Sequence, residues 1–113
     1  MKWLRITHAK NIPLREGRGV NLGGTEIAIF NLGGRFAAVE NSCPHRGGPL
    51  YDSIVAGNTA ICPLHGWNIC LDTGAVLKPE ICVRVQTYPV RVEDGIVMLQ
   101  LPDEEEAQRK DAA

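Results

Sequence analysis

Two short stretches of this chain combine cysteine with histidine and could therefore bind a metal. The first is Cys43-Pro44-His45 and the second is Cys62-Pro63-Leu64-His65, with sixteen residues between them. Thiolate sulfur and imidazole nitrogen are both good ligands for transition metals. Each stretch lies among Pro and Gly residues, which are typical of tight turns. The pattern predicts two loops that meet and that each supply one thiolate and one imidazole to a shared metal centre.

The ligand set favours an iron–sulfur cluster with two iron atoms. In a [2Fe–2S] centre of mixed ligation, two Cys bind one iron and two His bind the other. We therefore predict that Cys43 and Cys62 bind one iron. His45 and His65 would bind the second, with one cluster per chain. Neutral imidazoles make such a cluster easier to reduce than an all-thiolate one, and the predicted role is electron transfer.

Zinc is the alternative occupant of such a site. Two Cys and two His could hold one structural Zn²⁺ in a tetrahedron, in a small interaction module without redox chemistry. Zinc sites usually pair Cys with Cys and His with His at short spacing, whereas each stretch here mixes the two types. Colour separates the alternatives, because a zinc protein is colourless and an oxidised cluster of the mixed kind is red-brown.

From Trp3 to Leu101 the chain resembles the Rieske ferredoxin-like superfamily. The similarity rests on Cys43-Pro-His-Arg-Gly-Gly-Pro-Leu50, Cys62-Pro-Leu-His-Gly-Trp67 and the closing Val83-Arg-Val-Gln-Thr-Tyr-Pro-Val-Arg-Val92. The first two stretches are typical of the superfamily as a whole. With the third stretch, the chain is most similar to the small subunits of assimilatory NAD(P)H-dependent nitrite reductases.

This resemblance implies an electron-transfer or accessory subunit of a cytoplasmic oxidoreductase that reduces nitrite to ammonium. The partner would be a large subunit that carries FAD, a [4Fe–4S] cluster and sirohaem. The family's four ligand positions are all filled here, by Cys43, His45, Cys62 and His65. The second interpretation is a stand-alone Rieske ferredoxin that takes electrons from a flavin reductase and delivers them to an aromatic-ring-hydroxylating dioxygenase. In either case the isolated chain is expected to carry electrons and to have no catalytic residue.

The resemblance also implies a low reduction potential. Respiratory Rieske proteins place a Ser and a Tyr hydroxyl against the cluster sulfurs, where this chain has Trp67 and Ile69. Hydrogen bonds to sulfur raise the potential, so their loss predicts a value near the lower end for Rieske centres, about −150 mV. The family's histidine-bound iron lies near the surface, and we expect Pro49, Leu64 and Trp67 to form the rim at which a redox partner docks.

Composition and charge exclude other classes of function. The 113 residues suffice for one domain with a modest core, and a net charge of −1 does not indicate nucleic-acid binding. Residues 1–101 hold ten Lys/Arg and eight Asp/Glu, whereas residues 102–113 hold two and five. We predict a domain over 1–101 and a flexible acidic tail over 102–113. With no apolar run of membrane-spanning length and no apolar stretch at the start, a cytoplasmic location without membrane contact is expected.

Short β-patterned runs separated by turn residues predict an all-β fold. The predicted strands are Trp3–Thr7, Thr25–Asn31, Arg35–Glu40, Ser53–Ala56, Thr59–Ile61, Asn68–Leu71, Val83–Thr87, Val90–Glu93 and Ile96–Gln100. Turns are predicted at Leu32-Gly33-Gly34, at Asp72-Thr73-Gly74 and, as the strongest hairpin signal, at Asp94-Gly95. We expect a small antiparallel sandwich or barrel of the Rieske type, with the two cluster-binding loops in adjacent hairpins at one end.

Several residues that invite a functional interpretation are predicted to be structural. Cys70 and Cys82 lie in strand-like stretches and are expected to be reduced, buried thiols that pack as small hydrophobic side chains. His8 has no metal-like spacing and is expected at the surface, and Trp3 is expected to pack in the core or at a sheet edge. Trp67 fits either core packing or shielding of the cluster.

Overall fold

The computed structural model describes residues 3–42, 49–62, 66–78 and 84–101. Within these ranges the chain consists of antiparallel β-strands and one 3₁₀-helix, η1 (Ala9–Asn11), which confirms the all-β prediction. No helix in this part of the chain is both long enough and apolar enough to cross a bilayer. Of the predicted site residues, Cys43, His45 and His65 fall outside the described residues.

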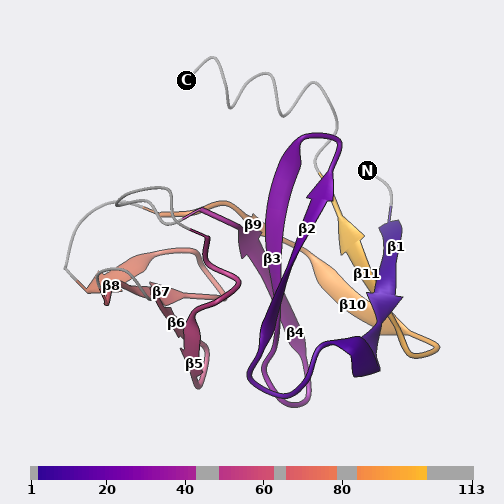
Figure 1. Cartoon of the computed structure of the whole chain (residues 1–113), viewed down its shortest axis with the longest axis horizontal. Helices are drawn as coiled ribbons and strands as arrows, with labels where there is room; N and C mark the ends of the chain where they lie inside the picture. Colours follow the sequence, from indigo (N-terminus) through magenta and orange to yellow (C-terminus); the bar gives the residue numbers. More distant parts are fainter. Residues whose placement is uncertain (1–2, 43–48, 63–65, 79–83, 102–113) are drawn as a thin grey trace.

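The strands form three sheets, with sheet B between the other two (Figure 1). Sheet A contains, in spatial order, β1 (Trp3–His8), β11 (Ile96–Gln100) and β10 (Val90–Glu93). Sheet B contains β2 (Gly17–Leu22), β3 (Thr25–Asn31), β4 (Phe36–Glu40) and β9 (Thr87–Tyr88). Sheet C contains β5 (Ile54–Ala56), β6 (Thr59–Ile61), β7 (Asn68–Cys70) and β8 (Val76–Lys78).

The strands β3 and β4 of sheet B are buried on both of their faces. Along β3, Ile27 and Ile29 belong to the core shared with sheet A, whereas Ala28 and Phe30 belong to the core shared with sheet C. Because successive side chains of a strand point to opposite faces, a strand with two buried faces needs a continuous apolar run. The predicted strand Thr25–Asn31 is confirmed, and its four buried residues form such a run.

Most predicted strands are confirmed, and β3, β6, β10 and β11 have the predicted bounds. Asp94 and Gly95 join β10 to β11 with φ angles of 53° and 76°, as a two-residue hairpin turn requires. The strands β2 and β8 are additional to the predicted set. The predicted strand Val83–Thr87 is wrong in its described part, because Arg84 forms only an isolated bridge to Ala75 and β9 begins at Thr87.

The connection after β4 also differs from the prediction. It leads from β4 in sheet B to β5 in sheet C, and these two strands do not pair. The connection between β6 and β7 does join paired neighbours and is a hairpin, as predicted. The expectation of two adjacent hairpins is therefore corrected for the first loop, since the chain changes sheets at this point.

Candidate metal centre

Cys62 is the predicted ligand that falls within the described residues. It directly follows β6, its exposed fraction is 1%, and it belongs to the core between sheets B and C. Its thiol is not part of a disulfide. A thiol in this position can supply a soft ligand that is shielded from water. The donor chemistry therefore fits the thiolate side of an iron–sulfur cluster.

Residues 62–67, the second motif segment, are closed by their own backbone. The N–H of Cys62 donates to the carbonyl oxygen of Trp67 at 2.8 Å, and the N–H of Gly66 donates to that of Cys62 at 2.9 Å. Gly66 has a φ of 70°, which glycine adopts without strain. The pairing continues into β6 and β7, where Ile61 lies opposite Asn68. The hairpin itself therefore fixes the backbone position of Cys62.

Residues 41–51, the first motif segment, are held at both ends by one side chain. Asn41 Oδ1 accepts hydrogen bonds from the backbone N–H groups of Leu50 at 2.8 Å and Tyr51 at 2.9 Å. The N–H of Asn41 donates to the carbonyl oxygen of Glu26 at 2.9 Å, directly beyond the β3–β4 ladder. Cys43 and His45 belong to this segment but lie outside the described residues.

Asn41 was not predicted from the sequence as a site residue. The only local signal is its position two residues before Cys43, together with the tendency of Asn side chains to bind backbone groups in turns. That tendency normally concerns backbone groups two or three residues away, whereas Asn41 binds across nine and ten residues. No sequence period indicates such a contact.

Both motif segments rest on one core. Leu50 and Cys62 are buried together between sheets B and C, and Trp67 packs against the same cluster of side chains. Ile69 is fully buried there. Core packing is therefore confirmed for Trp67, and shielding of the cluster by its ring stays a prediction.

An ion pair ties sheets B and C at the ends of β4 and β7 that face away from the motif segments. A guanidinium nitrogen of Arg35 lies 2.6 Å from a carboxylate oxygen of Asp72, and Asn58 Nδ2 donates to the same carboxylate at 2.9 Å. The hydrogen bond from Arg35, which has the larger effect, and the one from Asn58 hold the pKa of Asp72 below its usual value. The tie helps to set how the two sheets, and with them the two segments, lie relative to each other.

Cys70 lies in surroundings unlike those of Cys62. Burial by itself would raise the pKa of the Cys70 thiol, but hydrogen bonds from the Thr73 hydroxyl and from the backbone at Thr73 and Asp72 outweigh it and lower the pKa. Its side chain is only half-buried and is not in a disulfide. The prediction of a reduced thiol is confirmed, whereas the predicted role as a buried hydrophobic side chain is wrong. Cys82 lies outside the described residues.

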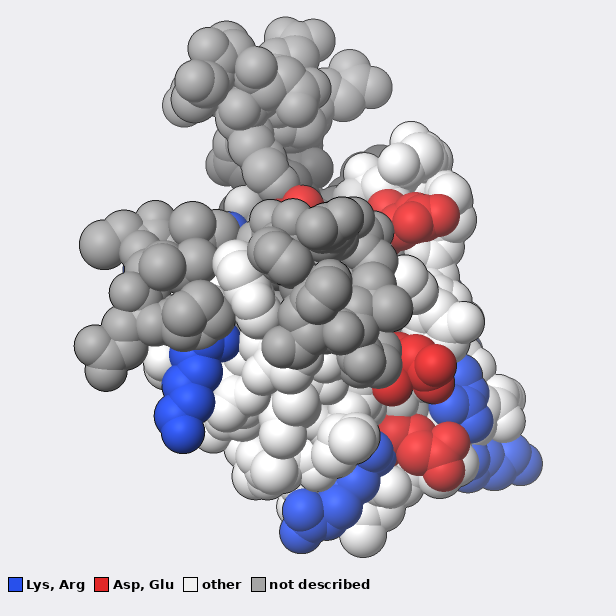
Figure 2. Space-filling view, turned by 60° about the vertical axis from the view of Figure 1, so that its left-hand side comes forward, with Lys and Arg blue, Asp and Glu red and all other residues white. Residues whose placement is uncertain are grey.

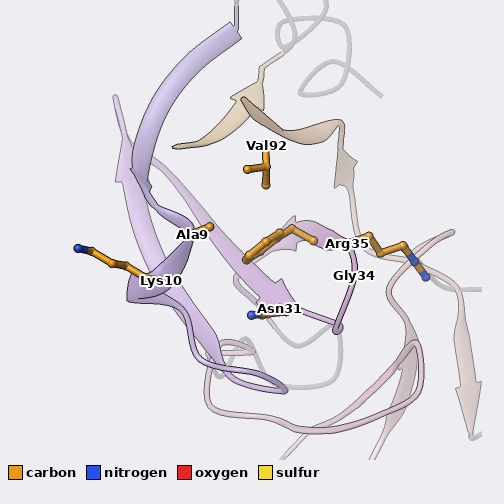
Figure 3. Close-up of a pocket in the computed structure, with 7 residues that line it drawn as sticks. Ala9, Lys10, Asn31, Gly34, Arg35 and Val92 are labelled. Atoms are coloured by element: carbon orange, nitrogen blue, oxygen red, sulfur yellow. The ribbon is translucent and has the colours of Figure 1, made fainter. Parts of the chain in front are cut away.

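A surface pocket of about 680 Å³ lies at the other end of β4, beside the β3–β4 turn, and not at the motif segments. Its lining includes Lys10, Asn31, Arg35 and Phe36. Arg35 is paired with Asp72, and Asn31 Nδ2 donates to the carbonyl oxygen of Ile12. Figure 3 shows the Lys10 and Arg35 side chains extending in opposite directions, away from the middle of the pocket. The lining therefore offers no converging polar groups, and we assign no ligand to it.

The described residues do not by themselves complete a metal site. No three His, Cys, Asp or Glu side chains among them lie close enough together to share a metal ion. Cys62 supplies one ligand, and the remaining predicted ligands fall in 43–48 and 63–65. His8 is exposed on β1, as predicted for a residue outside the site.

Comparison with known protein families adds a match over most of the chain. The model of the Rieske [2Fe–2S] domain matches residues 2–89. Among characterised proteins, the ferredoxin component of the naphthalene 1,2-dioxygenase system of Pseudomonas aeruginosa is 31% identical over 100 residues. That similarity covers 88% of this chain and 96% of the relative.

Solved structures with similar folds come from two kinds of redox system. The Sphingomonas yanoikuyae B1 ferredoxin has a TM-score of 0.80 and 28% identity, and the match covers 89% of this chain and 100% of the ferredoxin. A Mycobacterium tuberculosis protein, described as an NADH-dependent nitrite reductase small subunit, has a TM-score of 0.81 and 27% identity. That match covers 90% of this chain and 97% of the other.

Proposed function

Because this chain belongs to the Rieske [2Fe–2S] domain family, we propose that it is a one-electron carrier in an oxidoreductase system. The cofactor of the family is a Rieske-type [2Fe–2S] cluster, which when bound takes up and releases single electrons. We propose Cys43, His45, Cys62 and His65 as the ligands, because these residues fill the motif positions that the resemblance implies. The observation that carries the proposal is the buried thiol of Cys62, not in a disulfide, at the start of a hairpin segment closed by its own backbone.

The described residues around Cys62 would keep water away from the thiolate side of the centre. Leu50 and Ile69 are fully buried in the same core, and Trp67 covers part of it. Hydrogen-bonded strands on both sides of the second motif segment restrict movement of its backbone. A rigid, dry ligand environment supports electron transfer between fixed positions, and we propose no residue of this chain as a catalytic acid, base or nucleophile.

We propose that the carrier serves as the small subunit of a cytoplasmic nitrite reductase. The stretch Val83–Val92 supports this role because it resembles such subunits, and the similarity to the Mycobacterium tuberculosis protein extends over 90% of this chain. A large subunit with FAD, a [4Fe–4S] cluster and sirohaem would draw electrons from NAD(P)H, an intracellular reductant, and reduce nitrite to ammonium. This chain would relay electrons singly or hold the large subunit in its active form.

A ferredoxin of an aromatic-ring-hydroxylating dioxygenase is the second candidate. It is favoured by the similarity to the ferredoxin component of the naphthalene dioxygenase system, which covers nearly the whole length of both proteins. In this role a flavin reductase would supply the electrons, and a terminal oxygenase would receive them. The two candidates share the ligand set and differ in the partner.

The proposed docking surface lies on the side of sheet C. Figure 2 shows this side with an uncharged area between Lys and Arg side chains on the left and Asp and Glu side chains on the right. Pro49 is exposed and Trp67 is half-buried, so both are available for the rim predicted from the sequence, whereas Leu64 lies outside the described residues. An apolar rim suits a redox partner that must approach closely and then dissociate.

We further propose that one domain spans residues 1–101 and that residues 102–113 form a tail. The family match ends at residue 89, but β11 pairs with β1 on one side and with β10 on the other. The Trp3 ring also lies against Arg91, whose guanidinium carbon is 4.1 Å from the ring centroid. These contacts support a domain that extends through the last strand.

The test of this function mixes the purified holoprotein with each class of electron donor. Bleaching of the cluster by NAD(P)H in the presence of the large nitrite reductase subunit, with nitrite reoxidising it, is the expected result. Reduction only by a ferredoxin reductase, with reoxidation by an oxygenase, would transfer the role to the second candidate. A colourless protein that contains zinc would overturn electron transfer altogether.

The relay and accessory roles are separated by His65→Ala in the assembled nitrite reductase. If electrons pass through this chain, the variant complex loses nitrite turnover while both subunits stay associated. Unchanged turnover by the variant complex would contradict the relay and leave the accessory role.

A further inference from the structure

We propose that Asn41 is a positioning residue for the ligand pair Cys43 and His45. The inference rests on the proposed function, which assigns these two residues to the cluster. Asn41 is not itself proposed as a ligand. It acts through the backbone, because its side chain joins the two ends of the segment that carries both ligands.

The clamp consists of one oxygen atom and two backbone donors. Asn41 Oδ1 accepts from the N–H of Leu50 and from that of Tyr51, at 2.8 and 2.9 Å. The eight residues between Asn41 and Leu50 therefore start and finish at neighbouring points of the fold. Fixing the ends of a segment removes many of its alternative conformations before any ligand binds.

Both sides of the clamp are themselves anchored. The N–H of Asn41 donates to the carbonyl oxygen of Glu26 at 2.9 Å, which attaches it to sheet B. Leu50 is fully buried in the core that also contains Cys62. Asn41 thus links sheet B to the core beneath the second motif segment. We therefore expect this link to influence where the proposed ligands Cys43 and His45 lie relative to Cys62.

The neighbouring strand β2 is shaped to accept the clamp. A Cβ atom on Gly19 would lie 3.0 Å from Asn41 Nδ2 and 3.3 Å from the Tyr51 ring, closer than side chains normally pack. Glycine is unfavourable in a strand interior unless another part of the chain approaches closely. The absence of a side chain at Gly19 therefore lets Asn41 and Tyr51 lie on β2. Gly19 offers a second way to disturb the clamp while Asn41 is kept.

The test compares Asn41→Leu with Asn41→Asp in the purified holoprotein. Leucine has a similar size but no acceptor, whereas aspartate keeps an oxygen that can accept both N–H bonds. The measurements are iron and acid-labile sulfide per chain, the rate at which the cluster absorbance is lost, and the reduction potential of Asn41→Leu. We expect Asn41→Leu to lose its cluster roughly tenfold faster and to have a shifted potential. Asn41→Asp should retain the cluster at close to the wild-type rate.

Asn31→Leu is the matched control for a merely structural effect. Asn31 is the last residue of β3, much as Asn41 directly follows β4. It also binds backbone groups, as donor to Ile12 O and as acceptor from the N–H of Gly33. It lies at the β3–β4 turn, away from the motif segments. Its loss should lower thermal stability without faster cluster loss or a changed potential. Equal cluster loss in Asn31→Leu and Asn41→Leu would contradict the positioning role.

If Asn41→Leu does not fold, Gly19→Ala takes its place. The added methyl group should displace Asn41 slightly and accelerate cluster loss by a smaller factor in the same direction. If the wild-type protein holds a cluster and the variants lose theirs no faster than the wild type, the positioning role of Asn41 is overturned and the proposed function is not. A wild-type protein without any iron–sulfur cluster would instead overturn the proposed function.

Discussion

The two motif segments are closed in different ways, although each is predicted to supply one Cys and one His. Residues 62–67 are closed by hydrogen bonds between their own backbone groups inside a hairpin. Residues 41–51 are closed by the side chain of Asn41. A backbone closure tolerates most changes of side chain, whereas a side-chain closure depends on one residue. We therefore expect the proposed ligands of the first segment to be the more vulnerable to substitutions outside the motif.

The topology explains this difference. The second segment joins neighbouring strands of one sheet, so the ladder between β6 and β7 continues into it. The first segment crosses from sheet B to sheet C, and among the described residues no ladder connects its two ends. Backbone donors in such a place still need partners, and the oxygen of Asn41 supplies one for both Leu50 and Tyr51.

The largest expected effect comes from removing Cys62, a proposed ligand in the second segment. Cys62→Ser should abolish nearly all cluster binding, because the buried thiolate is proposed as one of two sulfur ligands of an iron. Cys70→Ser is the matched control on the next strand and should keep the cluster. Iron and sulfide analysis with visible absorption spectra measures both. A cluster retained by Cys62→Ser and lost by Cys70→Ser would reverse the assignment.

The second-largest effect is expected from a substitution at Leu50, the buried end of the first segment. Leu50 is fully buried, and Leu50→Ala is expected to lower the free energy of unfolding by about 2–5 kcal/mol through the cavity it creates. Ile54→Ala, four residues along the chain, is the control, because Ile54 is 67% exposed and its loss should change stability by no more than about 0.5 kcal/mol. Urea unfolding of the holoproteins compares them. Similar losses in the two variants would show that the first segment is not anchored by Leu50.

The backbone closure of the second segment depends on one conformation rather than on a side chain. A Cβ at Gly66 would meet no described atom within 4 Å, but its φ of 70° is unfavourable for alanine. Gly66→Ala should therefore cost about 1–2 kcal/mol of stability. Gly66→Asn should cost less, since asparagine tolerates positive φ better. A melting temperature of Gly66→Ala equal to or higher than that of the wild type would contradict this account of the closure.

The smallest effect is expected at the Arg35–Asp72 tie, which is solvent-exposed. Since the pKa of Asp72 is lowered in the folded state, its ion pair stabilises the fold above a pH of about 4 and is lost as the pH falls through the lowered value. Arg35→Gln should raise this pKa toward normal and cost about 0.5 kcal/mol at neutral pH. Carboxyl chemical shifts in NMR measure the pKa. Arg18→Gln is the control, because it removes the same charge from the ion pair with Glu16. If Arg18→Gln raised the pKa of Asp72 as much as Arg35→Gln does, the lowered pKa would not come from a specific contact with Arg35.

Local sequence patterns predict the parts of this fold that depend on local chemistry. The bounds of β3, β10 and β11 and the Asp94-Gly95 turn follow from apolar patterning and turn preference. The Cys and His motifs likewise indicate the family, which the match over residues 2–89 confirms. In each case a few consecutive residues contain the whole signal.

The unpredicted features depend on contacts between distant residues. The strand β2 contains Gly17 and Gly19, which local propensity counts against a strand, although their small size lets Tyr51 pack closely. The change of sheet after β4 depends on which strands pair, and the Asn41 clamp depends on that change. The surroundings of Cys70 arise from the turn that follows β7 and not from the apolar residues beside it in sequence.

The most direct measurement of the central claim is pulsed EPR of the reduced protein with ¹⁵N-labelled histidine. The chain has three histidines, so His8→Gln leaves only His45 and His65 as sources of the signal. The account predicts a [2Fe–2S] spectrum with couplings from two histidine nitrogens, unchanged in His8→Gln. A cluster without histidine coupling, or a protein with zinc and no paramagnetic centre, would contradict the claim that this chain carries electrons through a Rieske centre.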